Sequence, residues 1–379
     1  MSLSTDISPQ KQATPPEETP LLVYGCTPWR LSSQRVADLY DSGAKLWTKS
    51  DLTDIETQLE QSKTLDRFVI RCVDGSQVHV KNPIQGARTP IWKPYVVFQD
   101  YWKLVLGDTF DQPGTKYCSY RIDWKNYLAE DFRGNIEDWQ RLFATKQRLW
   151  NESITCASFK AELQKVIRAH QHVNKVVCFG LGDMTRRPPE TIALPPPLAG
   201  KQRQQQPEEE SDGASVDRPM MQHAMAMTLA DELGRRHDGG GDAVVVRLLA
   251  QDPRYGDDTK EFLKTRGFQI VGDFGAGGFQ EVDDQSIVIS CWTGAPIKQI
   301  IADLCRPVAI IILGDDGVVL NRFSRPYADG ESPRTRQMWQ GYDKWDFPVS
   351  SVEAELMTGF NPLKILVRRA GSEANASLA

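Results

Sequence analysis

Two glycines and an acidic residue follow an apolar run in the middle of the chain. Residues 176–179 are apolar and are followed by Gly180, Gly182 and Asp183, while a second apolar run closes at Asp252. In dinucleotide-binding folds, glycines after a strand let the backbone approach a phosphate, and an acid at the end of the next strand accepts hydrogen bonds from ribose hydroxyls. The spacing therefore predicts a site for a nucleotide-like ligand, such as an adenosine-containing compound, although the third glycine of that fingerprint is missing.

A further loop is expected at the same place. The apolar run 286–290 is followed by Cys291, Trp292 and Gly294. The carboxyl ends of parallel strands share one edge of a sheet, and ligands of doubly wound folds bind in the crevice at that edge. Trp292 offers a flat apolar face on which a ring can stack. The predicted cofactor-binding residues are Gly180, Gly182, Asp183, Asp252, Cys291, Trp292 and Gly294.

Other patterns of reactive residues are weaker. The seven cysteines are dispersed, and none forms a C-x-x-C pair, which favours reduced thiols over a disulfide framework or a zinc site. His170 and His172 are two residues apart and so lie on different sides of a helix. His223 lies within a methionine-rich helical stripe, a pattern more typical of core packing than of haem or metal binding. We expect no metal site, and no Ser-His-Asp order or P-loop identifies catalytic residues.

Charge and hydropathy exclude several classes of protein. The 45 basic and 50 acidic residues give a net charge of −5, which argues against a dedicated nucleic-acid binder. No apolar run approaches the roughly 20 residues that span a membrane. Residues 1–20 are polar and proline-rich, unlike a secretory signal. We expect a cytoplasmic or nuclear protein with neither a membrane nor a nucleic acid as partner.

The elements that would position these residues follow an alternating pattern. Continuous apolar runs alternate with amphipathic helical segments, which is typical of a parallel sheet covered on both faces. We predict an α/β, Rossmann-like, mostly parallel doubly wound sheet with the run 176–179 at its centre. One helix is expected to begin at Pro219 and another at Pro296, and Ser350 and Glu353 have the spacing of a capping box. The predicted strands are 176–179, 243–249, 268–271, 286–290, 308–313 and 365–367.

The composition divides the chain into regions. Residues 21–150 contain seven of the ten tryptophans and a β-hairpin pattern around Asp74-Gly75, so we expect a folded, aromatic-rich α+β region whose tryptophans form core rather than a recognition surface. Residues 186–218 are rich in proline, glutamine and glutamate, which predicts a disordered insertion between a strand and its helix. The predicted regions are a disordered lead-in 1–20, the aromatic-rich region 21–150, the core 151–321, an extension 322–370 and a tail 371–379.

Several of these patterns together resemble a known family. The strand with Gly180-Leu181-Gly182, the helix opening at Gln222, the strand end 251–255, Gly267 and the strand and loop 284–296 are similar to the SRR-like (sensitivity to red light reduced) domain. The resemblance covers about 150–320, and the tryptophan-rich region before it resembles fungal members. The family is linked to light signalling and the circadian clock in plants and to regulation of haem biosynthesis in animals. Plant and animal members usually carry Pro-His-Cys after the fourth strand; this chain has no histidine there, which argues against a Cys/His metal or haem role.

Three kinds of function follow. The resemblance implies a regulatory or interaction protein with protein partners, and we favour that interpretation. The 180–183 loop and Asp252 alternatively suggest a methyltransferase-like or dinucleotide-binding enzyme, and a fold without any ligand is the third interpretation. The acids near strand ends, Asp183, Asp252, Asp315 and Asp316, can equally well cap turns.

Overall fold

The computed structural model describes residues 27–86, 92–105, 117–126, 134–170, 172–187, 212–235, 246–291, 293–314 and 329–369. The predicted lead-in 1–20, the predicted tail 371–379 and the greater part of the predicted insertion 186–218 lie outside these residues, as does Trp292.

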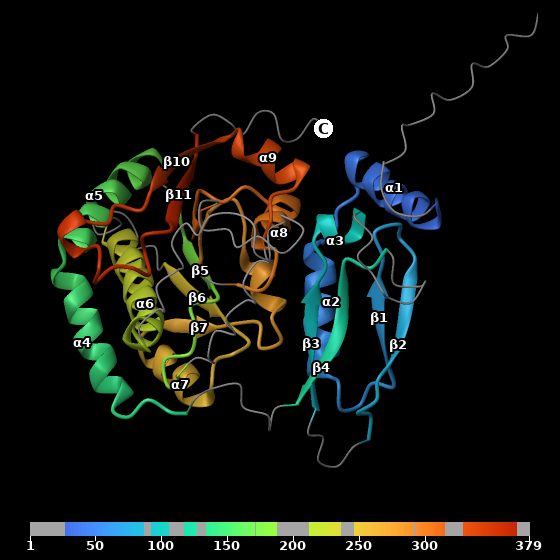
Figure 1. The fold of residues 1–379 in the computed structure, drawn as a ribbon, viewed down its shortest axis with the longest axis horizontal. Coiled ribbons are helices and arrows are strands. Elements are labelled where there is room, and N and C mark those ends of the chain that lie inside the picture. The colour runs from blue at the N-terminus through green and yellow to red at the C-terminus, as the bar shows by residue number, and fades with distance from the viewer. Residues whose placement is uncertain are drawn as a thin grey trace, which may run out of the picture.

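A seven-stranded sheet forms the centre of the described chain, in the order β10-β11-β9-β8-β5-β6-β7 (Figure 1). The block from β9 to β7 is parallel, and β11 and β10 join it as antiparallel strands. The predicted α/β fold with a mostly parallel sheet is therefore confirmed, and β5 lies in the middle of the parallel block. The strands are β5 (Lys175–Phe179), β6 (Arg247–Gln251), β7 (Phe268–Ile270), β8 (Ser286–Ser290), β9 (Ala309–Leu313), β10 (Tyr342–Asp346) and β11 (Leu363–Arg368).

One strand boundary differs from the prediction. The second strand was expected over 243–249, but β6 runs from Arg247 to Gln251, and residues 243–245 lie outside the described chain. Pairing explains where β6 begins, because Arg247 lies opposite Lys175, the first residue of β5. The strand then continues with buried residues until Gln251, whose partner is the last residue of β5.

Each face of the sheet is covered by a different set of elements. Val176 and Cys178 of β5 belong to one core with Phe159, whereas Val177 and Phe179 belong to the opposite core with Ile300. Four helices contribute to the first core, namely α4 (Trp139–Glu152), α5 (Ile154–Ala169), α6 (Asp212–Gly234) and α7 (Asp257–Thr265). The second core contains α8 (Ile297–Leu304), α9 (Pro333–Trp339) and the N-terminal region.

The N-terminal region packs against the second face of the sheet (Figure 1). The hairpin predicted around Asp74-Gly75 is confirmed, since β1 and β2 pair as antiparallel strands. Trp47 and Trp150 are fully buried, as expected of core tryptophans, whereas Trp92 is 46% exposed. The elements of this region are α1 (Thr27–Asp41), α2 (Lys49–Glu60), β1 (Arg67–Arg71), β2 (Gln77–Lys81), β3 (Trp92–Phe98), α3 (Tyr101–Val105) and β4 (Tyr120–Asn126).

Two carboxylates of this interface were not expected from the sequence. Glu56 of α2 accepts hydrogen bonds from the backbone N–H groups of Phe274, Ala276 and Gly277, at 2.9 to 3.0 Å. Asp303 of α8 accepts hydrogen bonds from the N–H groups at Leu46 and Trp47. Both contacts satisfy backbone donors of irregular segments where the two regions meet.

Helix α6 begins earlier than predicted. Its first residue is Asp212, so Pro219 lies inside the helix and not in its first turn. Two contacts stabilise the helical turns before the proline: Val216 is buried, and Asp217 forms an ion pair with Lys146 of α4. The predicted disordered insertion 186–218 is therefore wrong at its C-terminal end, while its first residue, Arg186, forms a β-bridge with Asn135.

The predicted capping box at Ser350 and Glu353 is wrong. The 3-10 helix there, η4 (Ser351–Glu353), has no side-chain cap. The Glu353 carboxylate instead accepts hydrogen bonds from the N–H groups of Ile154 and Thr155, both at 2.8 Å, and so caps the first turn of α5. A three-residue helix has few free N–H groups to offer, whereas the first turn of a sixteen-residue helix has four.

Candidate functional site

The fold places a topological switch point between β5 and β8. The two strands are parallel neighbours, with Phe179 opposite Ser290 at their carboxyl ends. The chain leaves β5 towards α6 on one face of the sheet and leaves β8 towards α8 on the other face. Open α/β sheets bind ligands in the crevice at such a point. Gly180 and Cys291, the first residues after these strands, therefore lie where a ligand is expected.

The two predicted acids cross-link the loops after β5 and β6. The Gly182 N–H donates to Asp252 Oδ2 at 2.9 Å, and the Gly256 N–H donates to Asp183 Oδ2 at 2.6 Å. Asp183 Oδ1 also accepts from the N–H and the hydroxyl of Thr185. Each carboxylate thus holds the backbone of the other loop, which is the turn-capping role that acids at strand ends often play.

The same contacts set the pKa of each acid. Burial raises the pKa of the Asp183 carboxyl, but its hydrogen bonds outweigh burial and hold the pKa below its ordinary value. Burial also raises the pKa of Asp252, and there the hydrogen bonds from Arg254 and Gly182 offset only part of the rise. Both carboxylates accept backbone hydrogen bonds across the two loops, so both behave as structural groups there.

Gly182 is needed for packing against α6. Its φ is +87°, and a Cβ at this position would lie 2.9 Å from Cγ of Pro219. The space beside Gly182, which we expected a ligand to occupy, is therefore filled by the ring of Pro219. Gly180 also has a positive φ, and its N–H donates to the Gln251 carbonyl.

The loop after β8 supplies the second group of predicted residues. Cys291 is buried, and burial raises the pKa of its thiol to about 12. Cys178 of β5 is also buried, with a thiol pKa raised well above its ordinary value, so both thiols stay protonated. A Cβ at Gly294 would meet nothing within 4 Å, so that backbone borders open space.

Helix α6 brings further residues that the sequence reasoning did not assign to the site. The Arg218 guanidinium lies near Cys291 and opposes the rise in its thiol pKa. His223 is fully buried, with Nδ1 2.7 Å from the Pro219 carbonyl and Nε2 2.8 Å from the Tyr255 hydroxyl. Because a carbonyl only accepts, Nδ1 carries the proton and Nε2 accepts from the tyrosine. Burial lowers the pKa of His223 to about 4, so the ring is neutral at pH 7.

At this edge, Gln222 is a buried side chain whose two polar atoms are both unsatisfied. It is 1% exposed, and neither its Oε1 nor its Nε2 has a hydrogen-bond partner among the described residues. It lies one helical turn after Arg218, on the face of α6 that reaches Cys291. A buried amide without partners is costly, which makes Gln222 the group best suited to bind a polar ligand here. Its signal in the sequence is a glutamine within an apolar methionine stripe.

The predicted residues therefore fall into two groups. Gly180, Gly182, Asp183 and Asp252 form the cross-linked loops beside β6, whereas Cys291 and Gly294 follow β8, and Cys291 lies near Arg218. Within the described ranges, no cluster of three or more His, Cys, Asp or Glu side chains has a geometry that could hold a metal ion.

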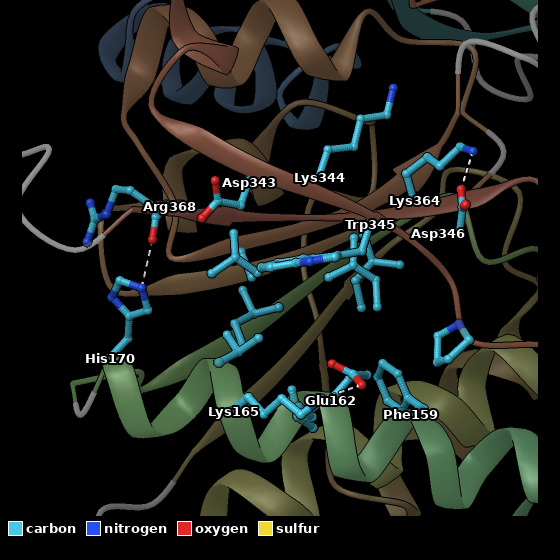
Figure 2. Close-up of a pocket in the computed structure, with 18 of the residues that line it drawn as sticks. Phe159, Glu162, Lys165, His170, Asp343, Lys344, Trp345, Asp346, Lys364 and Arg368 are labelled. Atoms are coloured by element: carbon cyan, nitrogen blue, oxygen red, sulfur yellow. Dashed lines mark hydrogen bonds and ion pairs between the residues drawn. The ribbon is translucent and has the colours of Figure 1, made fainter.

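A hollow lies away from this edge and contains none of the predicted residues. It is a groove of about 1030 Å³ between α5 and the strands β10 and β11 (Figure 2). Trp345 and Phe159 line it, together with several charged side chains. The tryptophan of an edge strand was not singled out in the sequence, because a single aromatic among charges carries no periodic signal.

The described core thus defines an α/β protein whose topological switch point lies between β5 and β8. Residues 159–317 match the family model of the SRR1 domain, which supports the resemblance to SRR-like proteins over the core of the chain. No curated protein and no solved structure matches the chain. None of the helices in the described ranges is long and apolar enough to cross a membrane.

Proposed function

We propose that this SRR1-domain protein has a regulatory or interaction role, and that it binds a ligand at the switch point without chemically changing it. The observation that carries the proposal is that the two carboxylates, the thiol and the histidine described at this edge are not available for proton transfer. Asp183 and Asp252 bind backbone N–H groups, the thiol pKa of Cys291 is raised to about 12, and His223 is neutral with both nitrogens bonded. General acid–base chemistry requires a group with a pKa near the working pH and free to move a proton.

We propose a nucleotide-like ligand, and we propose that the core is Rossmann-like. The Gln222 amide offers one donor and one acceptor, the pair with which glutamine binds the edge of an adenine. The Arg218 guanidinium on the same helix face favours an anionic group such as a phosphate. A cytoplasmic or nuclear location, protein partners and membership of the fungal type remain parts of the proposal that rest on the sequence.

Thermal unfolding with AMP, ATP, NAD and S-adenosylmethionine tests the ligand. We expect at least one adenosine-containing compound to stabilise the protein, by roughly 3 kcal/mol at a hundredfold excess over the dissociation constant. Chromatography of the ligand after prolonged incubation should show it unchanged. Turnover of the ligand would contradict the regulatory proposal and support an enzyme.

The variant Gln222→Leu separates a ligand-binding amide from a structural one. Removing a buried unpaired amide should leave the free protein equally stable or more stable, while the ligand-induced shift is lost. Gln99→Leu is the matched control, because Gln99 is also buried with an unpaired Nε2 but lies in the N-terminal region. A shift that persists in Gln222→Leu, or that is lost in Gln99→Leu as well, would contradict the site.

The alternative, a dinucleotide-binding or methyltransferase-like enzyme, has less support. It requires Asp252 to accept ribose hydroxyls and the 180–183 loop to approach a phosphate. In the structure, Asp252 accepts hydrogen bonds from Gly182 and Arg254, and Pro219 covers Gly182. Asp252→Asn, which keeps one acceptor oxygen, is the variant that tests this role, since Asp252→Ala would also release the loop.

A further inference from the structure

Two cysteines of the N-terminal region are in contact with each other. The Sγ atoms of Cys72 and Cys118 are 3.4 Å apart, although 46 positions separate the two residues in the chain. Both side chains are buried, and both thiols are free. Cys72 directly follows β1, and Cys118 lies two residues before β4. The contact therefore joins the β1–β2 hairpin to the β3–β4 pair, which lie side by side (Figure 1).

The backbone holds the two cysteines directly opposite each other. They form an isolated antiparallel β-bridge, in which the Val73 N–H donates to the Tyr117 carbonyl at 2.8 Å. Because this hydrogen bond joins the flanking residues, the cysteines are a non-hydrogen-bonded pair, whose Cα atoms typically lie about 4.5 Å apart. A disulfide requires Cα atoms about 4.4–6.8 Å apart. A bond between the two sulfurs therefore needs rotation of the side chains and no sliding of the strands.

The two thiols differ in acidity. The hydrogen bond with Cys118 lowers the pKa of Cys72 to about 7, and a hydrogen bond with Ser76 acts in the same direction, against burial. The same contact between the sulfurs, together with burial, raises the pKa of Cys118. Cys72 is thus suited to act as the nucleophile and Cys118 as the thiol that resolves the intermediate. The neighbouring turn at Gly75 and Ser76 is exposed, so Cys72 lies close to solvent.

We propose that Cys72 and Cys118 are a redox modification site, at which a peroxide converts the two thiols to a reversible disulfide between the hairpins. The Cys72 thiolate attacks one oxygen of hydrogen peroxide, the O–O bond breaks, and the other oxygen leaves as water with the Cys72 proton. The Cys118 sulfur then attacks the resulting sulfenic acid, the S–S bond forms, and the hydroxyl group leaves as water with the Cys118 proton. A dithiol reductant such as dithiothreitol reverses the change.

Peptide mapping of the full chain tests the proposal. The reduced protein is treated with hydrogen peroxide, the peroxide is removed with catalase, and the remaining thiols are blocked with N-ethylmaleimide in denaturant. We expect mass spectrometry of the digest to show the Cys72 and Cys118 peptides joined, about 2 Da lighter than their sum, and released by dithiothreitol. Oxidation of the two residues to sulfinic or sulfonic acids without this link would overturn the proposal, as would a link that forms only in urea-unfolded protein.

Thermal unfolding shows whether the folded protein accommodates the bond. A disulfide between residues 46 positions apart restricts the unfolded chain, so the peroxide-treated protein should melt about 5 °C higher than the reduced protein. Dithiothreitol should abolish the difference. A melting temperature that is unchanged or lower, with the linked peptides present, would show that the bond distorts the fold, and would overturn a site prepared by the backbone.

Matched variants assign the roles of the two sulfurs. Cys118→Ser keeps a hydrogen-bond donor beside Cys72, so peroxide should leave a sulfenic acid there that dimedone traps. Cys72→Ser should give neither the link nor a trapped adduct at Cys118. The control is Cys156→Ser, at a buried cysteine of α5, which should form the link as the natural protein does. Trapping at Cys118 instead of Cys72 would overturn the assigned roles. If a variant does not fold, the map of the natural chain still decides whether the site exists.

Discussion

At the scale of single residues, Gly182 and the neighbouring acids are held by contacts with parts of the chain that are distant in sequence. Gly182 does have a positive φ, and the residue that comes closest to it is Pro219 of α6. The proline is separated from Gly182 by a long polar segment, so no local pattern could connect them. Asp183 and Asp252 lie at the sheet edge and accept from backbone N–H groups of neighbouring loops, whereas Asp315 and Asp316 lie outside the described residues.

Gly182→Ala should destabilise the protein by about 2–3 kcal/mol, because a methyl group adds a clash with Pro219 to the strain of a left-handed backbone. Gly43→Ala is the matched control: its φ is +99°, and a Cβ there meets nothing within 4 Å, so it should lose only about 1 kcal/mol. Urea denaturation measures both. Adding Pro219→Ala to Gly182→Ala should recover the excess, and equal losses at the two glycines would show that the proline does not crowd the loop.

His223 should make stability depend on pH between about 6.5 and 4. The folded pKa is about 4 and the unfolded value is near 6.5, so the folded protein binds the proton more weakly. The contribution is fully present above pH 6.5 and is lost as the pH falls to the folded pKa, a total of about 3 kcal/mol. Unfolding free energies at several pH values should show this slope in the natural protein and in His172→Gln, an exposed histidine, but not in His223→Gln. The same slope in all three would assign it to other groups.

At the scale of elements, continuous apolar runs predicted the parallel strands well. The strands β7, β8 and β9 lie within one residue of their expected ends, because a strand buried on both faces is apolar throughout. The boundary of β6 depended on its partner strand, and β3, β4 and β10 alternate with charges or lie in irregular regions. The beginning of α6 depended on packing against α4. The residues within β6 and α6 therefore do not reveal where these elements begin, because their partners β5 and α4 decide it.

The cap of α5 shows the same dependence on a distant element. Glu353→Ala should cost about 1 kcal/mol, because it removes the acceptor for the N–H groups of Ile154 and Thr155. Glu355→Ala, at an exposed glutamate two residues on, should stay within about 0.5 kcal/mol. Equilibrium unfolding in urea measures the difference, and a Glu353→Ala protein as stable as Glu355→Ala would mean that water replaces the cap.

At the scale of the whole molecule, the candidate site was easier to predict than the arrangement of the regions. The switch point follows from strand order, which alternating strands and helices largely determine. Where the N-terminal region covers the second face, Glu56 and Asp303 contact segments more than 200 residues away in the sequence. Neither acid belongs to a sequence motif that predicts this role, so the contacts become visible only in the structure.

Asp303 should therefore be the most sensitive of these residues. Its side chain is buried on α8, where it accepts from the N–H groups of Leu46 and Trp47 and pairs with Arg334 of α9. Arg334 in turn donates to the carbonyls of Tyr40 and Ala44, so one ion pair joins the N-terminal region, the core and the C-terminal segment.

Asp303→Ala should destabilise the whole chain by about 3–5 kcal/mol, because it leaves a partly buried guanidinium and two N–H groups without their acceptor. The matched control is Asp273→Ala, which breaks an ion pair between Lys260 and the exposed carboxylate of Asp273 and should cost at most about 1 kcal/mol. Hydrogen exchange at Leu46 and Trp47 should accelerate in Asp303→Ala and remain slow in the control. If the two variants lose equal stability, the shared apolar core alone holds the regions together. Water would then replace the Asp303 carboxylate as hydrogen-bond acceptor.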